Sequence, residues 1–218
     1  MAWTYTREIA RKGVHLLSLF FIVIYFLFSA LFDHLAGLLA LIVLLMILII
    51  FEFYRLDLKQ GIPLISKFWW VKREKEKTKI GAEIFFLMGA IICFAVFDLR
   101  IAVAAILMTT FGDLAASLIG KKFGKHKLPY PKNKAWEGAI AELVVDIIVG
   151  FFVIRTLHQG IILGGLGLGQ PVWPIIIGMA VTATIVETVV DNIEDNLVVP
   201  IFSGFAGQII LMILMAFF

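Results

Sequence analysis

Seven long apolar stretches recur along this 218-residue chain, and they constrain its fold more than any other feature. A helix needs roughly 20 apolar residues to cross the hydrocarbon core of a bilayer. The stretches lie at about 13–32, 35–54, 83–98, 101–119, 138–155, 173–191 and 197–218. Because they are continuous apolar runs and not short alternating ones, they indicate helices rather than a barrel. We therefore predict an all-α, polytopic membrane protein with about seven transmembrane helices.

The composition also requires lipid as the main solvent of the fold. Hydrophobic residues make up 61% of the chain and charged residues 16%, whereas soluble domains have about 45–50% and about 25%. These values exclude a disordered protein, a disulfide scaffold and an ordinary cytosolic enzyme. The first apolar stretch is too long, and too soon followed by others, to be a removable signal peptide.

The basic residues predict which side of the membrane each connection faces. With a cytoplasmic N-terminus, every Lys and Arg except Arg100 and Arg155 falls in a cytoplasmic segment. This distribution follows the positive-inside rule. We expect one integral-membrane catalytic domain over residues 1–218, with cytoplasmic loops at about 55–80 and 120–137.

Acidic residues within the apolar stretches are the first candidates for function, because each costs roughly 2.5–3.5 kcal/mol or more in a membrane. Asp113 lies in the fourth stretch, near its cytoplasmic end. Glu187, Asp191 and Asp195 follow one another at four-residue steps, which brings them near one helix face. The basic 120–137 loop lies on the same side. Carboxylates beside lysines indicate Mg²⁺ or another divalent cation with a polyphosphate, because Mg²⁺ is usually held by one or two carboxylates and substrate phosphates.

The segment from residue 112 to residue 134 contains a stripe of small residues in its first half and most of its lysines in its second half. Gly112, Ala116, Gly120 and Gly124 are spaced four apart and form one smooth stripe. The stripe is explained either by close helix packing or by the approach of a nucleotide to the backbone, and both interpretations stay open. Several lysines follow it and would neutralise phosphates as point charges.

Three short blocks, in this order, resemble the membrane CTP-dependent lipid kinases. That family includes dolichol kinase, phytol and other polyprenol kinases and the yeast-type diacylglycerol kinase, and it is related to the CDP-lipid synthases. The blocks are Arg11-Lys12-x-x-His15, then Gly112-Asp113 through Gly120 and Gly124 to Lys134-x-x-Glu137-Gly138, then Glu187 with Asp195-Asn196-x-x-x-Pro200. The C-terminal Gly-rich and Asp-Arg-containing signature of the synthases is missing, which favours a kinase. Asp191-Asn192 duplicates the Asp-Asn pair, and we take Asp195 because its spacing to the proline fits.

The resemblance implies transfer of the γ-phosphoryl group of CTP to the hydroxyl of a polyprenol or isoprenoid alcohol (dolichol, phytol or geranylgeraniol type), giving a lipid monophosphate and CDP. The catalytic residues implied are Asp113, Glu187, Asp195 and Glu137, and the first three are also the implied metal ligands. The nucleotide-binding residues implied are Gly112, Gly120, Gly124, Lys125, Lys127, Lys132, Lys134, Gly138 and Asn196. Arg11, Lys12 and His15 are implied on the lipid or phosphate side. For Asn196, capping of the last helix is an equally good interpretation.

Four other functions stay open. They are a CDP-lipid synthase of the phosphatidate cytidylyltransferase type, a diacylglycerol kinase, a small ion-coupled transporter and a structural membrane subunit. Glu142 and Asp146, which lie deeper in the fifth stretch, are the best argument for transport. The expected partners are a membrane lipid and a nucleotide but not nucleic acid, and a homodimer is allowed. We expect the active site on the cytoplasmic side of a prokaryotic plasma membrane or an ER-type membrane. The sequence does not choose the lipid alcohol or the general base.

Overall fold

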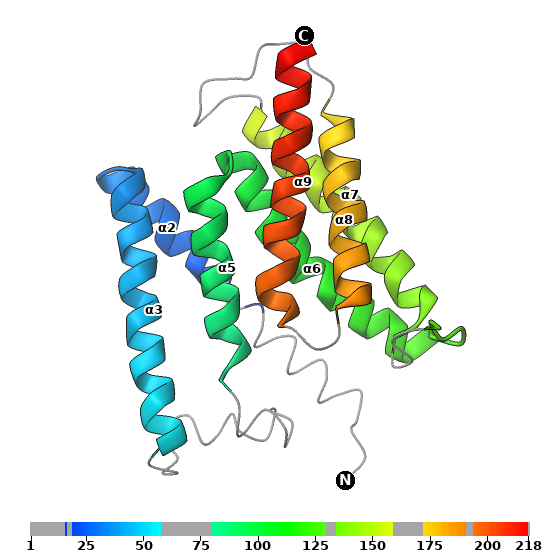
Figure 1. Ribbon diagram of the computed structural model, residues 1–218, viewed down its shortest axis with the longest axis horizontal. Coiled ribbons are helices and arrows are strands. Elements are labelled where there is room, and N and C mark those ends of the chain that lie inside the picture. Colours follow the sequence, from blue (N-terminus) through cyan, green and yellow to red (C-terminus); the bar gives the residue numbers. More distant parts are fainter. Residues whose placement is uncertain are drawn as a thin grey trace. The chain divides into compact units, whose positions relative to one another are not determined.

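The computed structural model describes Leu16 and residues 19–57, 80–129, 134–158, 172–190 and 194–217. In these ranges it is helical apart from turns and one isolated bridge between Lys127 and Ala135. The helices are α2 (Leu19–Leu31), α3 (His34–Asp57), α5 (Ala82–Val96), α6 (Leu99–Phe123), α7 (Trp136–His158), α8 (Trp173–Val189) and α9 (Asp195–Phe217). Each predicted apolar stretch coincides with one helix, so the predicted all-α class is confirmed (Figure 1).

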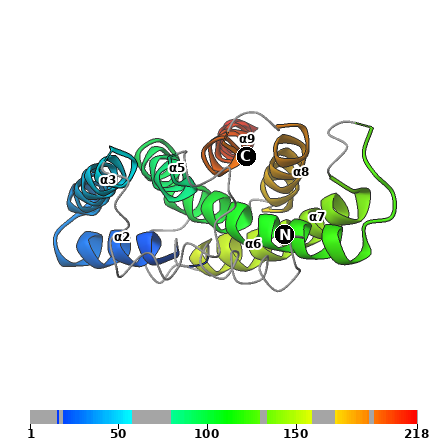
Figure 2. The ribbon, with the colours of Figure 1, turned by 90° about the horizontal axis from the view of Figure 1, so that it is seen from below.

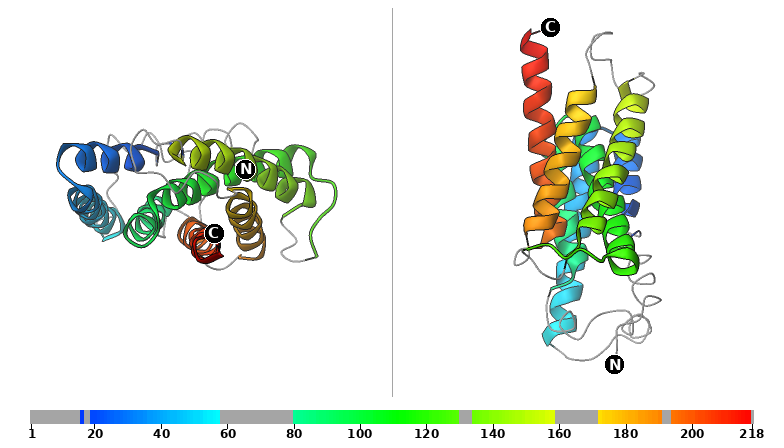
Figure 3. Two further views of the ribbon diagram at one scale, coloured as in Figure 1. Left: turned by 90° about the horizontal axis from the view of Figure 1, so that it is seen from above. Right: turned by 90° about the vertical axis from the view of Figure 1, so that its right-hand side faces the viewer.

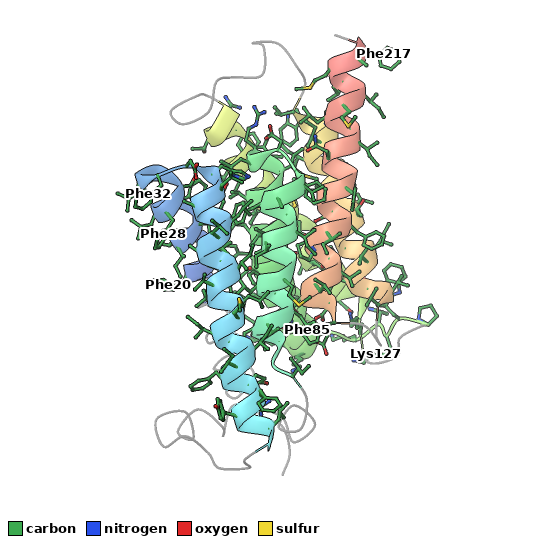
Figure 4. The ribbon with its side chains drawn as sticks, turned by 60° about the vertical axis from the view of Figure 1, so that its left-hand side comes forward. Phe20, Phe28, Phe32, Phe85, Lys127 and Phe217 are labelled. Atoms are coloured by element: carbon green, nitrogen blue, oxygen red, sulfur yellow. The ribbon has the colours of Figure 1, made fainter. Side chains whose placement is uncertain are left out.

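The helices carry apolar side chains on their outer surfaces, which is typical of a membrane protein. By length and composition, α3, α6 and α9 could each cross a bilayer, whereas α2, α5 and α8 are shorter apolar helices. Phe20 and Phe28 on α2, and Phe32 just after it, project outward (Figure 4) and are 61%, 39% and 74% exposed. In water such a surface would be unfavourable, but in hydrocarbon it is the normal outer surface of a helix.

The chain divides into two compact units, Met1–Ile91 and Ile92–Phe218. In the first unit α2 and α3 pack against each other through Gly37, where a Cβ would lie only 2.9 Å from the ring of Tyr25. The Tyr25 hydroxyl is hydrogen-bonded to His34 Nδ1 at 2.6 Å, although its ring is buried. These contacts fix the α2–α3 turn.

The second unit is built on the pairing of α6 with α7 (Figures 2 and 3). Small residues control this pairing. A Cβ on Gly138 would lie 2.8 Å from the carbonyl oxygen of Ala116, and one on Gly150 would lie 2.4 Å from Met108 Cε. As residue numbers rise along α7 they therefore fall along α6, so the two helices are antiparallel. Close packing of the small-residue kind thus accounts for this part of the stripe.

Helices α8 and α9 pack on each other; α8 also contacts α6 and α7, and α9 contacts α6 (Figure 1). A Cβ on Gly207 would lie within 3.1 Å of both Met179 on α8 and Ile101 on α6, so the three helices meet there. Pro200 lies inside α9, and the helix continues through it to Phe217. The ring removes the backbone donor that would otherwise pair with the carbonyl of Asn196 in the second turn of the helix.

Candidate functional site

The segment that joins α6 to α7 is held by Glu137, the second residue of α7. Its Oε1 accepts hydrogen bonds from the backbone amides of Lys125 and His126, both at 3.1 Å, and lies 2.7 Å from His126 Nδ1. Hydrogen bonding from its own amide, then from His126, lowers the pKa of Glu137 to about 2. Glu137 is therefore an ionised residue that holds the backbone of a lysine-bearing segment, and its catalytic role stays a prediction.

Two backbone hydrogen bonds join the residues that precede positions 130–133 to those that follow them. Leu128 N donates to the Lys134 carbonyl at 3.1 Å, and Trp136 N donates to the His126 carbonyl at 3.0 Å. Lys127 and Phe217 lie at opposite ends of the second unit (Figure 4). Because α9 runs from Asp195 to Phe217, its first turn lies at the Lys127 end.

Lys134 and Glu187 join two parts of the chain that are 53 residues apart. The Lys134 ammonium donates to the backbone carbonyl of Glu187 and also lies 3.2 Å from its Oε1. The Glu187 side chain is 9% exposed and the Lys134 side chain 25%. A carboxylate that is buried near a helix end is thus balanced by a cation that still reaches solvent.

Deeper along α7, Glu142 and Asp146 lie one turn apart and are 3% and 0% exposed. Gly112 on α6 lies directly against them, because a Cβ there would be 2.4 Å from Asp146 Oδ1 and 3.1 Å from Glu142 Cγ. Glu142 is close enough to interact electrostatically with Glu187, Asp113 and Lys134 as well as with Asp146. The acid predicted on α6 and the acid predicted on α8 therefore belong to one electrostatic neighbourhood.

The donors in this neighbourhood are suited to a hard cation, because carboxylate oxygens are the ligands that Mg²⁺ prefers. Within the described ranges, however, no three His, Cys, Asp or Glu side chains are grouped closely enough to form a protein-only metal site. A Mg²⁺ ion that takes one or two carboxylates and substrate phosphates needs no such group. Asp113 and Glu187 therefore fit a nucleotide-associated cation whose coordination is completed by phosphate oxygens.

The other predicted residues take the following positions. Asp195 begins α9 and accepts from the amide of Asn196 at 2.8 Å, and Asn196 is 7% exposed. Gly120 packs near Gly138, with a Cβ-to-Cα separation of 3.5 Å. A Cβ on Gly124 would collide with the Gly120 carbonyl oxygen. Contact of these residues with nucleotide stays a prediction. Arg11, Lys12, His15 and Lys132 lie outside the described residues.

Two features of the site were missed by the sequence reasoning. Glu142 and Asp146 were considered only for transport, although they share the buried helix face of Gly138 and Gly150. Their four-residue spacing within that stripe was the available signal. His126 was assigned no role, and nothing in its local sequence indicates the contact with Glu137.

The cytidylyltransferase family model matches residues 1–217, which is nearly the whole chain and includes both units. The chain belongs to the cytidylyltransferase family. The predicted relationship to CTP-using lipid enzymes is thereby confirmed. No solved structure gives a significant match.

Curated relatives of this cytidylyltransferase-family chain are named as lipid kinases. It is 30% identical over 115 residues to a probable phytol kinase 2, chloroplastic, of Oryza sativa subsp. japonica, covering 50% of this chain and 36% of the relative. It is 28% identical over 134 residues to the CTP-dependent diacylglycerol kinase 1 of Schizosaccharomyces pombe, covering 61% of each. It is 30% identical over 146 residues to phytol kinase 1, chloroplastic, of Arabidopsis thaliana, covering 64% and 47%. The chain thus matches about half the length of these relatives.

Proposed function

We propose that this chain is a CTP-dependent lipid kinase. It would transfer the γ-phosphoryl group of CTP to the hydroxyl of an isoprenoid alcohol of the dolichol, phytol or geranylgeraniol type, giving a lipid monophosphate and CDP. The observation that carries the proposal is the contact of Lys134 with Glu187, because it joins the middle and C-terminal motif blocks. The names of the relatives, phytol kinases and a CTP-dependent diacylglycerol kinase, support the same reaction.

Phosphoryl transfer depends mainly on positioning and on neutralisation of the phosphate charge. Lys134 is part-exposed and would leave Glu187 for the triphosphate, assisted by Lys125, Lys127 and Lys132. The ion pair would thus keep the lysine in place before the nucleotide arrives. Asn196 and Gly124, at the end of α6, would line the nucleotide.

Asp113, Glu187 and Asp195 would serve as ligands for Mg²⁺ or would orient the attacking hydroxyl. When bound, the cation would neutralise charge on the transferred phosphate. Glu137 would hold the amides of Lys125 and His126 so that the lysine-bearing segment keeps its conformation. Arg11, Lys12 and His15 would contact the lipid or its new phosphate.

We further propose that all seven helices cross the membrane, with the N-terminus in the cytoplasm. The site would then lie at the cytoplasmic boundary, where CTP is available. The acceptor hydroxyl would reach it from the cytoplasmic leaflet while the apolar tail stays in lipid. The distribution of Lys and Arg supports this orientation.

Labelled CTP tests the reaction directly. Purified protein is incubated with phytol and Mg²⁺, and either the α- or the γ-phosphate of CTP carries the label. A kinase places the γ-label in lipid and releases α-labelled CDP. A panel of dolichol, geranylgeraniol and diacylglycerol, each with CTP or another nucleoside triphosphate and with or without Mg²⁺, then identifies the acceptor, the donor base and the cation requirement.

A CDP-lipid synthase is the second candidate, because the matching family is described as cytidylyltransferases. Such an enzyme attacks the α-phosphorus of CTP and releases pyrophosphate. With phosphatidate as acceptor, α-label in the lipid and γ-label in pyrophosphate would reject the kinase and favour this alternative.

A further inference from the structure

Asp146 is a buried carboxylate that no described residue of the chain hydrogen-bonds. The residue is 0% exposed, and neither of its carboxylate oxygens has a hydrogen-bond partner among the residues that the structure describes. An ionised carboxylate that is buried without partners is strongly unfavourable, so native proteins pair such groups or use them to bind metal. Neither the contacts of Glu137 nor the Lys134–Glu187 ion pair involves this carboxylate.

The groups around Asp146 increase the excess of negative charge. Glu142 lies one turn away on the same buried face, and Glu187 interacts electrostatically with both acids. Asp113 adds a further carboxylate within range of Glu142. Lys134 supplies positive charge, but its ammonium is already bound to Glu187. Among the described groups that interact with Glu142, three are thus acids and one is a lysine.

Gly112 keeps the space beside these two carboxylates free of any side chain. A single methyl group there would lie 2.4 Å from Asp146 Oδ1, well inside contact distance. Glycine within a helix costs about 1 kcal/mol relative to alanine, and α6 carries this glycine in its buried face. The position is therefore adapted to the two acids on α7 and not only to the packing of the helices.

We propose that Glu142 and Asp146 form a binding site for a hard divalent cation such as Mg²⁺ or Mn²⁺. Two carboxylates at adjacent turns are the number of protein ligands that Mg²⁺ usually takes, with water or other oxygens completing its coordination. The site is distinct from the ligands assigned to the nucleotide-associated ion, which are Asp113, Glu187 and Asp195. It does not depend on phosphoryl transfer, and it would exist in the absence of CTP and lipid.

The test uses the full chain purified in detergent, without nucleotide or lipid substrate. Binding of Mn²⁺ is measured by electron paramagnetic resonance, and the unfolding temperature is measured in EDTA and in Mn²⁺. We expect Asp146→Asn to weaken Mn²⁺ binding by about ten- to a hundredfold or more. Loss of a residue that only supports a metal ligand already has an effect of this size. In EDTA this variant should unfold at or above the wild-type temperature, because an unbalanced buried charge is gone. In Mn²⁺ the order should reverse.

Asp33→Asn is the matched control, since it makes the same chemical change in the first unit. Asp33 accepts from the amide of Ala36 at 2.7 Å at the start of α3, and asparagine can make the same bond. This variant should bind Mn²⁺ like the wild type. Gly112→Ala is a second test variant, which keeps both acids but fills the space beside them and should also weaken Mn²⁺ binding.

Equal Mn²⁺ binding by the wild type and Asp146→Asn would overturn the proposal, as would an unfolding order that is the same in EDTA and in Mn²⁺. The two acids would then be neutralised by protons. The labelled-CTP assay is scored separately. Retained Mn²⁺ binding without lipid phosphorylation would reject the kinase and leave this cation site standing, whereas the opposite pair of results would reject only the cation site.

Discussion

Two buried carboxylates, one in each unit, have opposite surroundings. Glu52 on α3 is 7% exposed, and it accepts from Arg55 Nε and from the amide of Gly81, both at 2.7 Å. Asp146 on α7 is 0% exposed, and within the described part of the chain neither of its carboxylate oxygens has a hydrogen-bond partner. Glu52 has the full set of donors expected of an acid that holds helices together. An acid that lacks such donors, within a group of other acids, has the surroundings of a ligand-binding residue.

Lys134 and Glu187 are intermediate between these two extremes. Their ion pair is made, but the lysine is part-exposed and therefore available to an incoming anion. The three carboxylates thus form a series from a saturated structural pair, through an exchangeable pair, to an unbalanced acid. This series can be tested by removing the same kind of group at each position.

The largest effect is the difference in stability expected between Glu52→Gln and Asp146→Asn, which convert a buried carboxylate of each unit to an amide. Glu52→Gln removes the carboxylate that accepts from Arg55 and from the amide of Gly81, and loss of one member of a buried ion pair costs about 3–5 kcal/mol. Asp146→Asn should cost nothing in EDTA, because no partner is lost. The free energy of unfolding, measured with a denaturing detergent, checks both. Equal destabilisation by the two changes would show that Asp146 is satisfied by protein groups and would remove the contrast.

The exchangeable pair is tested by Lys134→Met. Transfer of the γ-label from CTP to phytol should fall about 10²- to 10³-fold, as when one donor to the transition-state charge is removed. Arg155→Met is the control, since it removes a cation from the far end of α7, the helix that begins two residues after Lys134. A Lys134→Met protein with wild-type transfer would contradict the assignment of this lysine to the triphosphate.

The close α6–α7 crossing brings Asp113 on α6 near Glu142 on α7. Gly138→Ala tests this crossing. The new Cβ would lie 2.8 Å from the Ala116 carbonyl oxygen, so the helices must separate. Overpacking of this kind costs about 1–3 kcal/mol of stability. Gly120→Ala is the matched control, because its Cβ would meet Gly138 Cα at an ordinary 3.5 Å. Thermal unfolding should lower the midpoint of Gly138→Ala more than that of Gly120→Ala, and the reverse order would be evidence against this crossing.

The smallest effect is expected at Glu137, whose pKa is lowered to about 2. A carboxyl whose pKa is lower in the folded protein adds stability above its unfolded pKa and loses it as the pH falls through the folded value. Glu137→Gln should therefore lower the unfolding temperature slightly at neutral pH. The difference from wild type should shrink as the pH falls from 4.5 toward about 2. A difference that does not change over this range would show that the ionised form is not what holds the Lys125 and His126 amides.

Much of the local structure was predictable because each helix is encoded by its own residues. The apolar runs predicted seven helices, and the structure contains a helix at each. The start of α6 follows from Asp98, whose side chain accepts from the Arg100 amide at 3.0 Å. Pro200 was less predictive. It lies in the second turn of α9 and the helix continues through it, although proline inside a helix removes a hydrogen bond and often breaks the helix.

The family resemblance and the acidic and lysine residues of the candidate site were determined by the sequence alone. Only the tertiary structure decided that Lys134 contacts Glu187 and that Asp146 lies against Gly112. The physical reason is the solvent. In water, the apolar face of a helix is the face that is buried, so the sequence pattern identifies it. In lipid nearly every face is apolar, and the pattern does not specify which faces meet. That choice depends on where the small residues of α6 and α7 allow the two backbones to approach, and it is made only when the helices pack.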